Sequence, residues 1–210
     1  MTVADGHPWI AALYDPVTWI AEQTRFRPYR QELAQNLSGN ILDIGAGTGA
    51  MFPYVDPLAN SAAYYAIEPD PHMRARARKR AKQLDFSVDI RDARAEALPF
   101  DDATFDVVLA SLVFCTIPDP EQAIAEITRV LKPGGEFRFF EHVVDTGWRN
   151  TLQSLLSPVW KRAAGGCHLT RRTQQTFLAA DGLEVIELER RLDGITPVRP
   201  FIHGRMYRTS

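Results

Sequence analysis

The sequence predicts an α/β protein whose parallel sheet is covered by helices on both faces. Between about Ser38 and His142, short β-type runs alternate with helical runs, which is the pattern of a parallel sheet built from β-α units. A glycine-rich loop follows the first β-type run directly. The chain has 210 residues, 45% of them apolar and 24% charged, which suits one globular core with a small appended part.

Five strands and two helices are expected in this region. The strands are predicted at residues 41–44, 63–68, 86–90, 105–110 and 136–142, and the helices at residues 71–84 and 120–131. Each helical run starts with a proline, which suits the first turn of a helix, and the sequence KPGG at residues 132–135 ends the second one.

Helices and strands are also expected on both sides of this region. Residues 7–37 have a helical pattern rich in large aromatic rings and lie outside the β-α rhythm, so they are interpreted as a cover over the strand ends. After the region, helices are predicted at residues 148–163 and 170–180, and strands at residues 183–188 and 200–207.

The charge balance argues against a nucleic-acid partner. The net charge is −2, with −5 in residues 1–140 and +3 in residues 141–210, so the chain has no general attraction for polyanions. The basic cluster at residues 74–82 holds six basic residues in nine. It is typical of a solvated helix face, and binding to RNA or to a membrane surface is the less favoured interpretation.

Cysteine usage and hydropathy favour a cytoplasmic protein. Cys115 and Cys167 are too few for a disulfide framework or a four-thiolate zinc site, and both are expected to be reduced. The N-terminal residues lack the basic start and apolar core of a secretion signal. No apolar run approaches the ~18 residues that a membrane span requires. The oligomeric state is left open.

The sharpest signal is the glycine loop at residues 43–49, with the sequence DIGAGTG. Its glycines allow a tight turn from a strand into a helix and let a ligand approach the backbone, while a helix N-terminus favours negative charge. A nucleotide-like cofactor is therefore expected. Gly45, Gly47 and Ala50 also satisfy the relaxed dinucleotide pattern, so a nicotinamide cofactor stays open at this point.

Three acidic residues near the loop add to this signal. Asp43 stands two residues before the first glycine, where a carboxylate suits a cofactor that carries an amine. Glu68 ends the second predicted strand, where it can accept hydrogen bonds from ribose hydroxyls. Asp92 follows the third strand and is placed to meet an adenine edge. Each of them alone could simply cap a strand or a helix.

The order of these motifs resembles that of class I S-adenosylmethionine-dependent methyltransferases. The matching segments are residues 43–49, Glu68, Asp92-Ala93, residues 97–100 (ALPF), 105–108 (FDVV) and 129–135 (RVLKPGG). The resemblance implies a Rossmann-like, seven-stranded, mostly parallel sheet whose last strand is antiparallel, and S-adenosylmethionine as the cofactor. It also implies these cofactor-binding residues: Asp43, Gly45, Ala46, Gly47 and Gly49 for the methionine part, Glu68 and Pro69 for ribose, Asp92 and Ala93 for adenine, and Ser111 and Leu112 at the border with the acceptor.

The C-terminal third resembles the thiol S-methyltransferases and their bacterial relatives. The resemblance rests on EHV at residues 141–143, Trp148, PVWK at 158–161, GCHLTR at 166–171 and VRPFIHG at 198–204. The membrane-associated members carry an apolar N-terminal anchor, which is not expected here. We therefore predict one methyltransferase domain over residues 1–210, made of a helical cover (1–37), a cofactor-binding core (38–142) and a substrate-shaping part (143–210).

The acceptor chemistry points to the end of the fifth strand. His142 is the candidate general base, although a structural histidine that fixes the strand end is about as good an interpretation. Glu141 alternates to the opposite face. Phe114, Cys167 and His168 are expected to shape the substrate site, and Tyr14, with Trp9 and Trp19, to close an apolar pocket over it. No metal site is expected, because no ligand spacing is recognisable.

The leading prediction is an enzyme that methylates a small, rather apolar acceptor, with a thiol favoured. A thiol has a pKa near ~8.5, so it needs only modest help from a base. The alternatives are methylation of a phospholipid amine or of a quinone-like ring carbon, a cofactor-binding protein without transferase activity, and a nicotinamide oxidoreductase.

Overall fold

The computed structural model describes residues 8–55, 63–192 and 197–209, without the side chains of residues 13, 14, 17–20 and 23. These residues form a seven-stranded sheet with the strand order β3-β2-β1-β4-β5-β7-β6. The strands are β1 (Asn40–Ile44), β2 (Ala63–Ile67), β3 (Val88–Arg91), β4 (Phe105–Ser111), β5 (Leu131–His142), β6 (Leu183–Arg191) and β7 (Phe201–Arg208).

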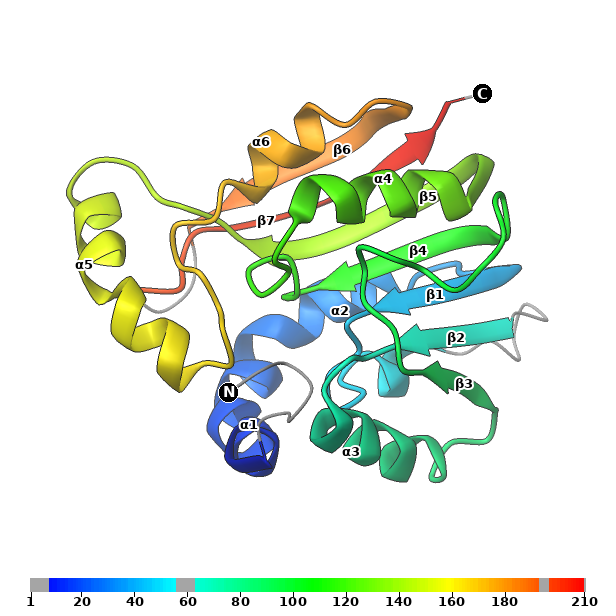
Figure 1. Cartoon of the computed structure of the whole chain (residues 1–210), viewed down its shortest axis with the longest axis horizontal. Coiled ribbons are helices and arrows are strands. Elements are labelled where there is room, and N and C mark those ends of the chain that lie inside the picture. Colours follow the sequence, from blue (N-terminus) through cyan, green and yellow to red (C-terminus); the bar gives the residue numbers. More distant parts are fainter. Residues whose placement is uncertain (1–7, 56–62, 193–196, 210) are drawn as a thin grey trace.

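The first five strands are parallel to one another, and β7 is antiparallel to both β5 and β6. The mostly parallel sheet and its antiparallel last strand are therefore confirmed. The carboxyl ends of β1, β2 and β4 meet at one edge of the sheet, on the left in Figure 1.

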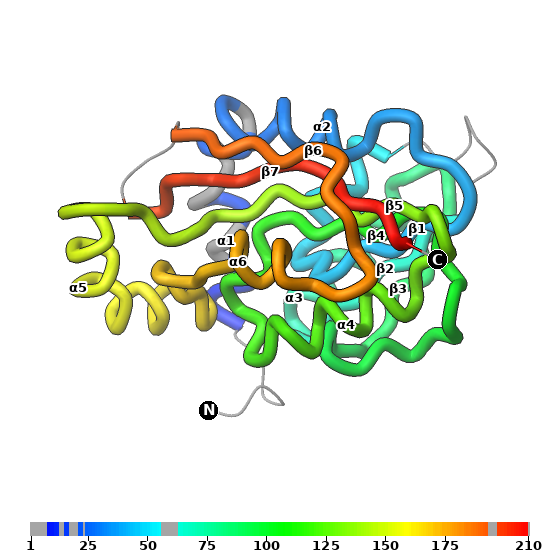
Figure 2. The backbone as a smooth tube through the Cα atoms, turned by 90° about the horizontal axis from the view of Figure 1, so that it is seen from above, coloured from blue at the N-terminus to red at the C-terminus, as the bar shows by residue number. Residues whose placement is uncertain are grey.

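The helices lie on both faces of this sheet. They are α1 (Pro8–Ala21), the π-helical turn η2 (Glu22–Phe26), α2 (Arg27–Leu33), the 3-10 turn η3 (Phe52–Tyr54), α3 (Pro71–Ala81), α4 (Pro120–Val130), α5 (Trp148–Ala163) and α6 (Thr173–Leu178). Figure 2 shows α2 on one side of the strands and α4 and α6 on the other. Among the described residues, none of the helices combines the length and hydropathy needed to cross a bilayer.

Alternation along the strands builds a core on each face. In β1, Ile41 packs into the core beneath α2 and α3, while Leu42 and Ile44 pack into the core beneath α4 and α6. In β4, Leu109 and Val108 divide in the same way. Because both faces are apolar, most residues of these central strands are buried, as is usual in a parallel sheet covered on both faces.

The sequence predicts where α3 and α4 start more accurately than where helices end. Asp70 caps α3 by accepting hydrogen bonds from the N–H groups of His72 (2.8 Å) and Met73 (3.0 Å). Asp119 caps α4 through the N–H of Gln122 at 3.0 Å. The helix predicted at residues 71–84 ends at Ala81, and the one predicted at 170–180 covers only Thr173–Leu178.

The prediction of a helix directly after the glycine loop is corrected by the structure. Among the described residues after β1, turns lead into η3, a single 3-10 turn of three residues. Pro53 lies in the first turn of this segment, where proline is tolerated, and the segment ends because the backbone of Val55 is extended (φ −92°, ψ 129°).

The N-terminal helices are tied to the strand ends by buried polar contacts. Arg30 of α2 is buried, forms an ion pair with Glu22 at 2.6 Å and donates a hydrogen bond to Ser111 Oγ at 3.0 Å. Asp15 of α1 accepts a hydrogen bond from Thr48 Oγ1 of the glycine loop at 2.6 Å and pairs with Arg80 at 2.9 Å. Nothing in the sequence pattern marked Arg30 as a buried link between helix and sheet.

The basic cluster of residues 74–82 is only partly a solvated face. Arg74 is buried and pairs with Asp92 at 2.8 Å, and Arg80 pairs with Asp15. Arg78 donates to the carbonyl of Ile90 at 3.3 Å. Three of its six cations therefore bind the chain itself, which leaves less of the cluster for a polyanion.

Replacing Arg30 by methionine is expected to lower the free energy of unfolding by about 2–4 kcal/mol, because the change leaves a largely buried Glu22 carboxylate unpaired. Urea unfolding measures the loss. The matched controls are Glu22→Gln and the double variant, whose cost should fall below the sum of the two single costs. A loss within about 0.5 kcal/mol for Arg30→Met, as at an ordinary surface site, contradicts the link.

Candidate active site

The candidate site lies where β1, β2, β4 and β5 end. The strand order reverses between β1 and β4, since β2 and β3 lie on one side of β1 while β4 and β5 lie on the other. In open parallel sheets, such a switch point forms a crevice at the carboxyl ends of the strands. The glycine loop leaves β1 at this point.

Glycine is favoured at the three loop positions for different structural reasons. Gly45, Gly47 and Gly49 have φ angles of +62°, +57° and +81°. A Cβ at Gly45 would lie 2.2 Å from Val113 Cγ2, and one at Gly49 would lie 2.6 Å from the Phe52 ring, so packing excludes a side chain at both. A Cβ at Gly47 would meet only the Gly45 carbonyl oxygen, at 4.0 Å. The backbone of Gly47 is therefore open to a ligand.

Glu68 holds the glycine loop from the end of β2. One carboxylate oxygen accepts the N–H of Gly47 and the other accepts the N–H of Asp70, both at 2.8 Å. Burial raises the pKa of Glu68 against these two hydrogen bonds, which act to lower it. Each oxygen keeps a further lone pair for a ligand hydroxyl. The Ala46 N–H donates to Ile67 O at 3.0 Å and fastens the loop to β2 as well.

Asp43 lies beneath the loop and is 1% exposed. The Tyr64 hydroxyl donates to its carboxylate at 3.1 Å. Burial raises the pKa of Asp43 to about 7, although the Tyr64 hydrogen bond and the Arg30 charge lower it. Near neutral pH, this carboxyl group is poised between its charged and uncharged forms.

The adenine side is more open than the rest of the site. The Asp92 side chain is 67% exposed and pairs with Arg74, which also donates to the carbonyls of Glu68 at 2.6 Å and Pro69 at 3.0 Å. Arg74 thus fixes the backbone after β2 and the acid after β3 together. Ala93 is partly buried against the core.

The loop after β4 is held by Glu141, for which the sequence predicts only a position on the face opposite His142. Glu141 is fully buried and accepts the N–H groups of Val113 at 2.9 Å and Phe114 at 3.2 Å. Burial raises its pKa to about 7 against these two bonds. Leu112 has φ +59°, a left-handed conformation that non-glycine residues rarely adopt, and its N–H donates to Phe140 O at 2.8 Å. The sequence signal that could have identified Glu141 is an acidic residue next to the end of a buried strand.

Two predicted acceptor residues are placed differently from expectation. Phe114 is a core residue: it is fully buried, and its ring packs edge-on against Phe177 at 4.7 Å. The substrate-wall interpretation of Phe114 is therefore corrected, because the chain after β4 turns its ring beneath the sheet face that α6 covers. Trp9 is exposed and does not close a pocket. The side chains of Tyr14 and Trp19 lie outside the described residues.

The end of β5 brings His142 against the C-terminal part. His142 is 2% exposed, and its Nε2 lies 3.1 Å from the Cys167 sulfur. A hydrogen bond from Cys115 lowers the pKa of the Cys167 thiol, and a hydrogen bond and the charge of His142 lower it further. The contact with Cys167, together with burial, raises the pKa of the Cys115 thiol. His142 Nδ1 is buried and has no hydrogen-bond partner among the described residues.

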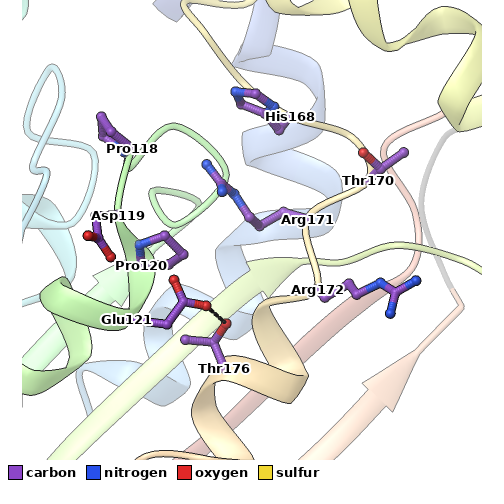
Figure 3. Close-up of a pocket in the computed structure, with 9 residues that line it drawn as sticks. All are labelled: Pro118, Asp119, Pro120, Glu121, His168, Thr170, Arg171, Arg172 and Thr176. Atoms are coloured by element: carbon purple, nitrogen blue, oxygen red, sulfur yellow. Dashed lines mark hydrogen bonds between the residues drawn. The ribbon is translucent and has the colours of Figure 1, made fainter.

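His168 lines an open cavity of about 560 Å³ between the starts of α4 and α6. Figure 3 shows its lining, in which Glu121 and Thr176 form a hydrogen bond of 3.3 Å. The other lining residues are Pro118, Asp119, Pro120, Thr170, Arg171 and Arg172. Burial and the nearby Lys161 and Arg171 charges lower the pKa of His168. None of the predicted cofactor-binding residues lines this cavity.

This arrangement defines a class of protein. A Rossmann-like sheet with an antiparallel last strand, an open glycine at the switch point and an acid at the end of β2 is the arrangement expected of class I methyltransferases. The space over Gly47 and the free lone pairs of Glu68 fit a nucleoside-type cofactor with a small polar end.

Comparisons with known proteins agree with this class. The sequence profile described as "Methyltransferase domain" matches residues 42–139. Human thiol S-methyltransferase TMT1B is 30% identical over 172 residues, which cover 79% of this chain and 69% of that protein. Phosphatidylethanolamine N-methyltransferase of Cereibacter sphaeroides is 32% identical over 106 residues, which cover 50% of this chain and 51% of that protein. A SAM-dependent methyltransferase structure from Thermotoga maritima superposes with a TM-score of 0.65 at 21% identity and covers 97% of this chain and 100% of that one.

The chain belongs to the methyltransferase family that includes the thiol S-methyltransferases. It is an S-adenosylmethionine-dependent methyltransferase, and S-adenosylmethionine is its cofactor. The dinucleotide interpretation of Gly45, Gly47 and Ala50 is therefore wrong, as is that of a binding protein without transferase activity.

Asp43→Asn is expected to flatten the pH dependence of stability between pH 4 and 7. Because burial raises the folded pKa of Asp43 from 3.8 to about 7, the native state holds a proton that the unfolded state releases, and stability falls as pH rises through this interval. Asparagine stays uncharged and still accepts the Tyr64 hydroxyl. Urea unfolding at about pH 5 and about pH 8 should show the variant gaining on the wild type at the higher pH.

The control for this experiment is Asp106→Asn. Lys132 and the Asn40 N–H hold the pKa of Asp106 below its usual value, so Asp106 is charged in both states across the tested interval and its loss should leave the slope unchanged. Equal slopes for the wild type and Asp43→Asn would show that the buried carboxyl group is not protonated.

Proposed function

We propose that this enzyme methylates a small, rather apolar acceptor and that the acceptor is a thiol. The extent of the TMT1B match carries this proposal. That match spans 172 residues, whereas the predicted cofactor-binding core spans only residues 38–142. The likeness to a thiol S-methyltransferase therefore includes residues outside the core, where acceptor chemistry is expected to be set.

The cofactor is proposed to lie along the strand ends. Gly47 offers its backbone to the methionine part, between Gly45, Ala46 and Gly49, and Asp43 lies beneath this point to balance the cofactor's amine. Glu68 and Pro69 are proposed to meet the ribose, and Asp92 and Ala93 the adenine. Ser111 and Leu112 are proposed to border the methyl group. The open Gly47 backbone and the partly unused Glu68 oxygens support this assignment.

S-adenosylmethionine supplies an electrophilic methyl group, which a thiol takes to become a thioether. The protein's share is mainly to align the acceptor and to exclude water. The left-handed Leu112 and the Glu141 hydrogen bonds fix the backbone next to the proposed methyl position. A rigid wall at this point favours one direction of approach for the acceptor.

A thiol acceptor needs little help from a base, because its pKa lies near ~8.5 and part of it is already thiolate near neutral pH. The base role predicted for His142 is kept as a proposal: its buried Nδ1 is a free polar atom at the end of β5. Cys167 and His168 are proposed to shape the acceptor site from the loop after α5. The side chain of Tyr14 lies outside the described residues, so its role over the acceptor site stays a prediction.

A phospholipid amine is the second candidate acceptor. The match to phosphatidylethanolamine N-methyltransferase favours it, but that match spans 106 residues, about the length of the core, so it does not require a shared acceptor region. A quinone-like ring carbon was the other predicted alternative, and it enters the acceptor panel below.

We further propose a cytoplasmic location and no nucleic-acid partner. Two buried, unpaired cysteines suit a compartment that keeps thiols reduced. A net charge of −2, with Arg74, Arg78 and Arg80 bound within the chain, supports a small molecule rather than a polyanion as the partner.

Gly47→Ala is expected to weaken S-adenosylhomocysteine binding at least about tenfold, because a methyl group there occupies the open backbone face. Gly134→Ala is the matched control: Gly134 also has a positive φ, +77°, and no neighbour within 4 Å of its added Cβ, but it lies near the start of β5, at the opposite end of that strand from His142. Both changes should cost about 1–2 kcal/mol of stability. Calorimetry that finds equal affinities for the two variants contradicts the proposed cofactor position.

Turnover of an acceptor panel tests the acceptor. With S-adenosylmethionine, alkyl and aromatic thiols should be methylated, and their rate should rise with pH toward the thiol pKa as the thiolate fraction grows. Phenols, amines, phosphatidylethanolamine vesicles and a quinone precursor should react far more slowly. Turnover of amines or quinones with none of thiols overturns the thiol proposal while leaving the cofactor site intact.

A further inference from the structure

Two cysteines and one histidine from three separate segments meet at one buried point. Cys115 lies in the loop after β4, His142 ends β5, and Cys167 lies in the loop between α5 and α6. They are 3%, 2% and 8% exposed. One potential ligand atom from each lies within 4.8 Å of those of the other two.

Backbone contacts hold these three residues in place. The His168 N–H donates to Cys115 O at 2.9 Å, so the loop after α5 is fastened directly to the loop after β4. Gly165 and Gly166, with φ angles of +62° and +92°, turn the chain back from α5 just before Cys167. The Val143 N–H donates to Pro200 O at 2.9 Å and fixes the end of β5. The cluster is thus built by the fold.

The thiols have contacts, since Cys115 Sγ lies 3.8 Å from Leu112 O and Cys167 meets Cys115 and Trp160, but the imidazole ring is poorly provided with partners. His142 Nδ1 has none among the described residues, and Nε2 faces only the Cys167 sulfur, at 3.1 Å. Both cysteines of the chain are free thiols and lie in this cluster. A buried imidazole whose only partner is a thiol is costly, whereas sulfur and imidazole together form a strong ligand set for a soft cation.

We propose that Cys115, His142 and Cys167 bind a divalent soft cation, and that this ion is Zn²⁺. Tetrahedral Zn²⁺ with Zn–S near 2.3 Å and Zn–N near 2.0–2.1 Å needs sulfur atoms about 3.8 Å apart and sulfur–nitrogen distances of about 3.6 Å. The observed Nε2–Cys167 sulfur contact, 3.1 Å, is shorter than this, and all ligand atoms lie within 4.8 Å of one another, so a bound ion would have to move Nε2 and this sulfur apart by about 0.5 Å.

Sequence reasoning predicted no metal site, and the reason is spacing. The ligands are at least 25 residues apart, unlike the close pairs of familiar zinc motifs. Only the pairing of β4 with β5, together with the return of the chain after α5, brings them to one point.

Three protein ligands leave a fourth position open, as in catalytic zinc sites. If the proposed function holds, an acceptor thiol can bind the ion at this fourth position. It then gives its proton to solvent and remains bound to the ion as a thiolate. An ion on Nε2 also takes the lone pair at that nitrogen. Nδ1 then carries the ring proton, so with the ion bound His142 holds the metal, and the base role proposed for it above applies only to the metal-free enzyme.

Metal binding by the full-length protein tests the site. After chelation under a phosphine reductant, the protein should take up about one Zn²⁺ per chain by elemental analysis. Co²⁺ in its place should show thiolate-to-cobalt charge transfer and the intense visible bands of a tetrahedral site. Cys115→Ser, Cys167→Ser and His142→Asn should each weaken Zn²⁺ binding by at least about a hundredfold in competition with a chromophoric chelator.

His72→Gln is the matched control, because His72 is exposed on α3 and should leave metal uptake unchanged. Cys115→Ala and circular dichroism guard against loss through misfolding. The proposal is overturned if the folded wild type takes up no Zn²⁺, if Co²⁺ shows no thiolate band, or if the folded cysteine variants retain full affinity. S-adenosylhomocysteine binding, measured on the same samples, reports separately on the methyltransferase site.

Discussion

The hydrogen bond from the Gly47 N–H to Glu68 is the contact on which the site's geometry depends. It holds the glycine loop against the end of β2, while Glu141 holds the loop after β4 through two further N–H groups. The two loops then lock each other, because Val113 fills the space that a side chain at Gly45 would need. Two buried acids, one after β2 and one in β5, thus hold the two loops that follow the strands between them, β1 and β4.

This design has an electrostatic cost that explains several of the other contacts. Burial raises the pKa values of Asp43, Glu68 and Glu141. Each acid is offset by donors, which are a tyrosine hydroxyl for Asp43 and pairs of backbone N–H groups for the other two. Arg30 adds a buried positive charge from α2. The N-terminal helices therefore belong to the electrostatics of the strand ends and do more than cover them.

The sequence predicted what local patterns control. Short β-type runs predicted all seven strands to within a few residues, apart from the longer start of β5, and the prolines at positions 71 and 120 predicted the starts of α3 and α4. It could not predict contacts between distant segments. Arg30, the Cys115–His142–Cys167 cluster and the burial of Phe114 all depend on how loops return after the strands.

The position of the C-terminal part suggests how one core can serve different acceptors. The loop after α5 reaches the β4 loop and the end of β5, where Cys167 meets His142 and the His168 N–H meets Cys115 O. The core alone supplies the glycine loop and the acids that suit a cofactor. Because Cys167, which contacts His142, comes from residues beyond the core, the proposed function implies that a change in residues 143–210 alters acceptor chemistry and leaves the cofactor geometry intact. Relatives that match only over the core are therefore weak guides to the acceptor, and those that match through the tail are stronger ones.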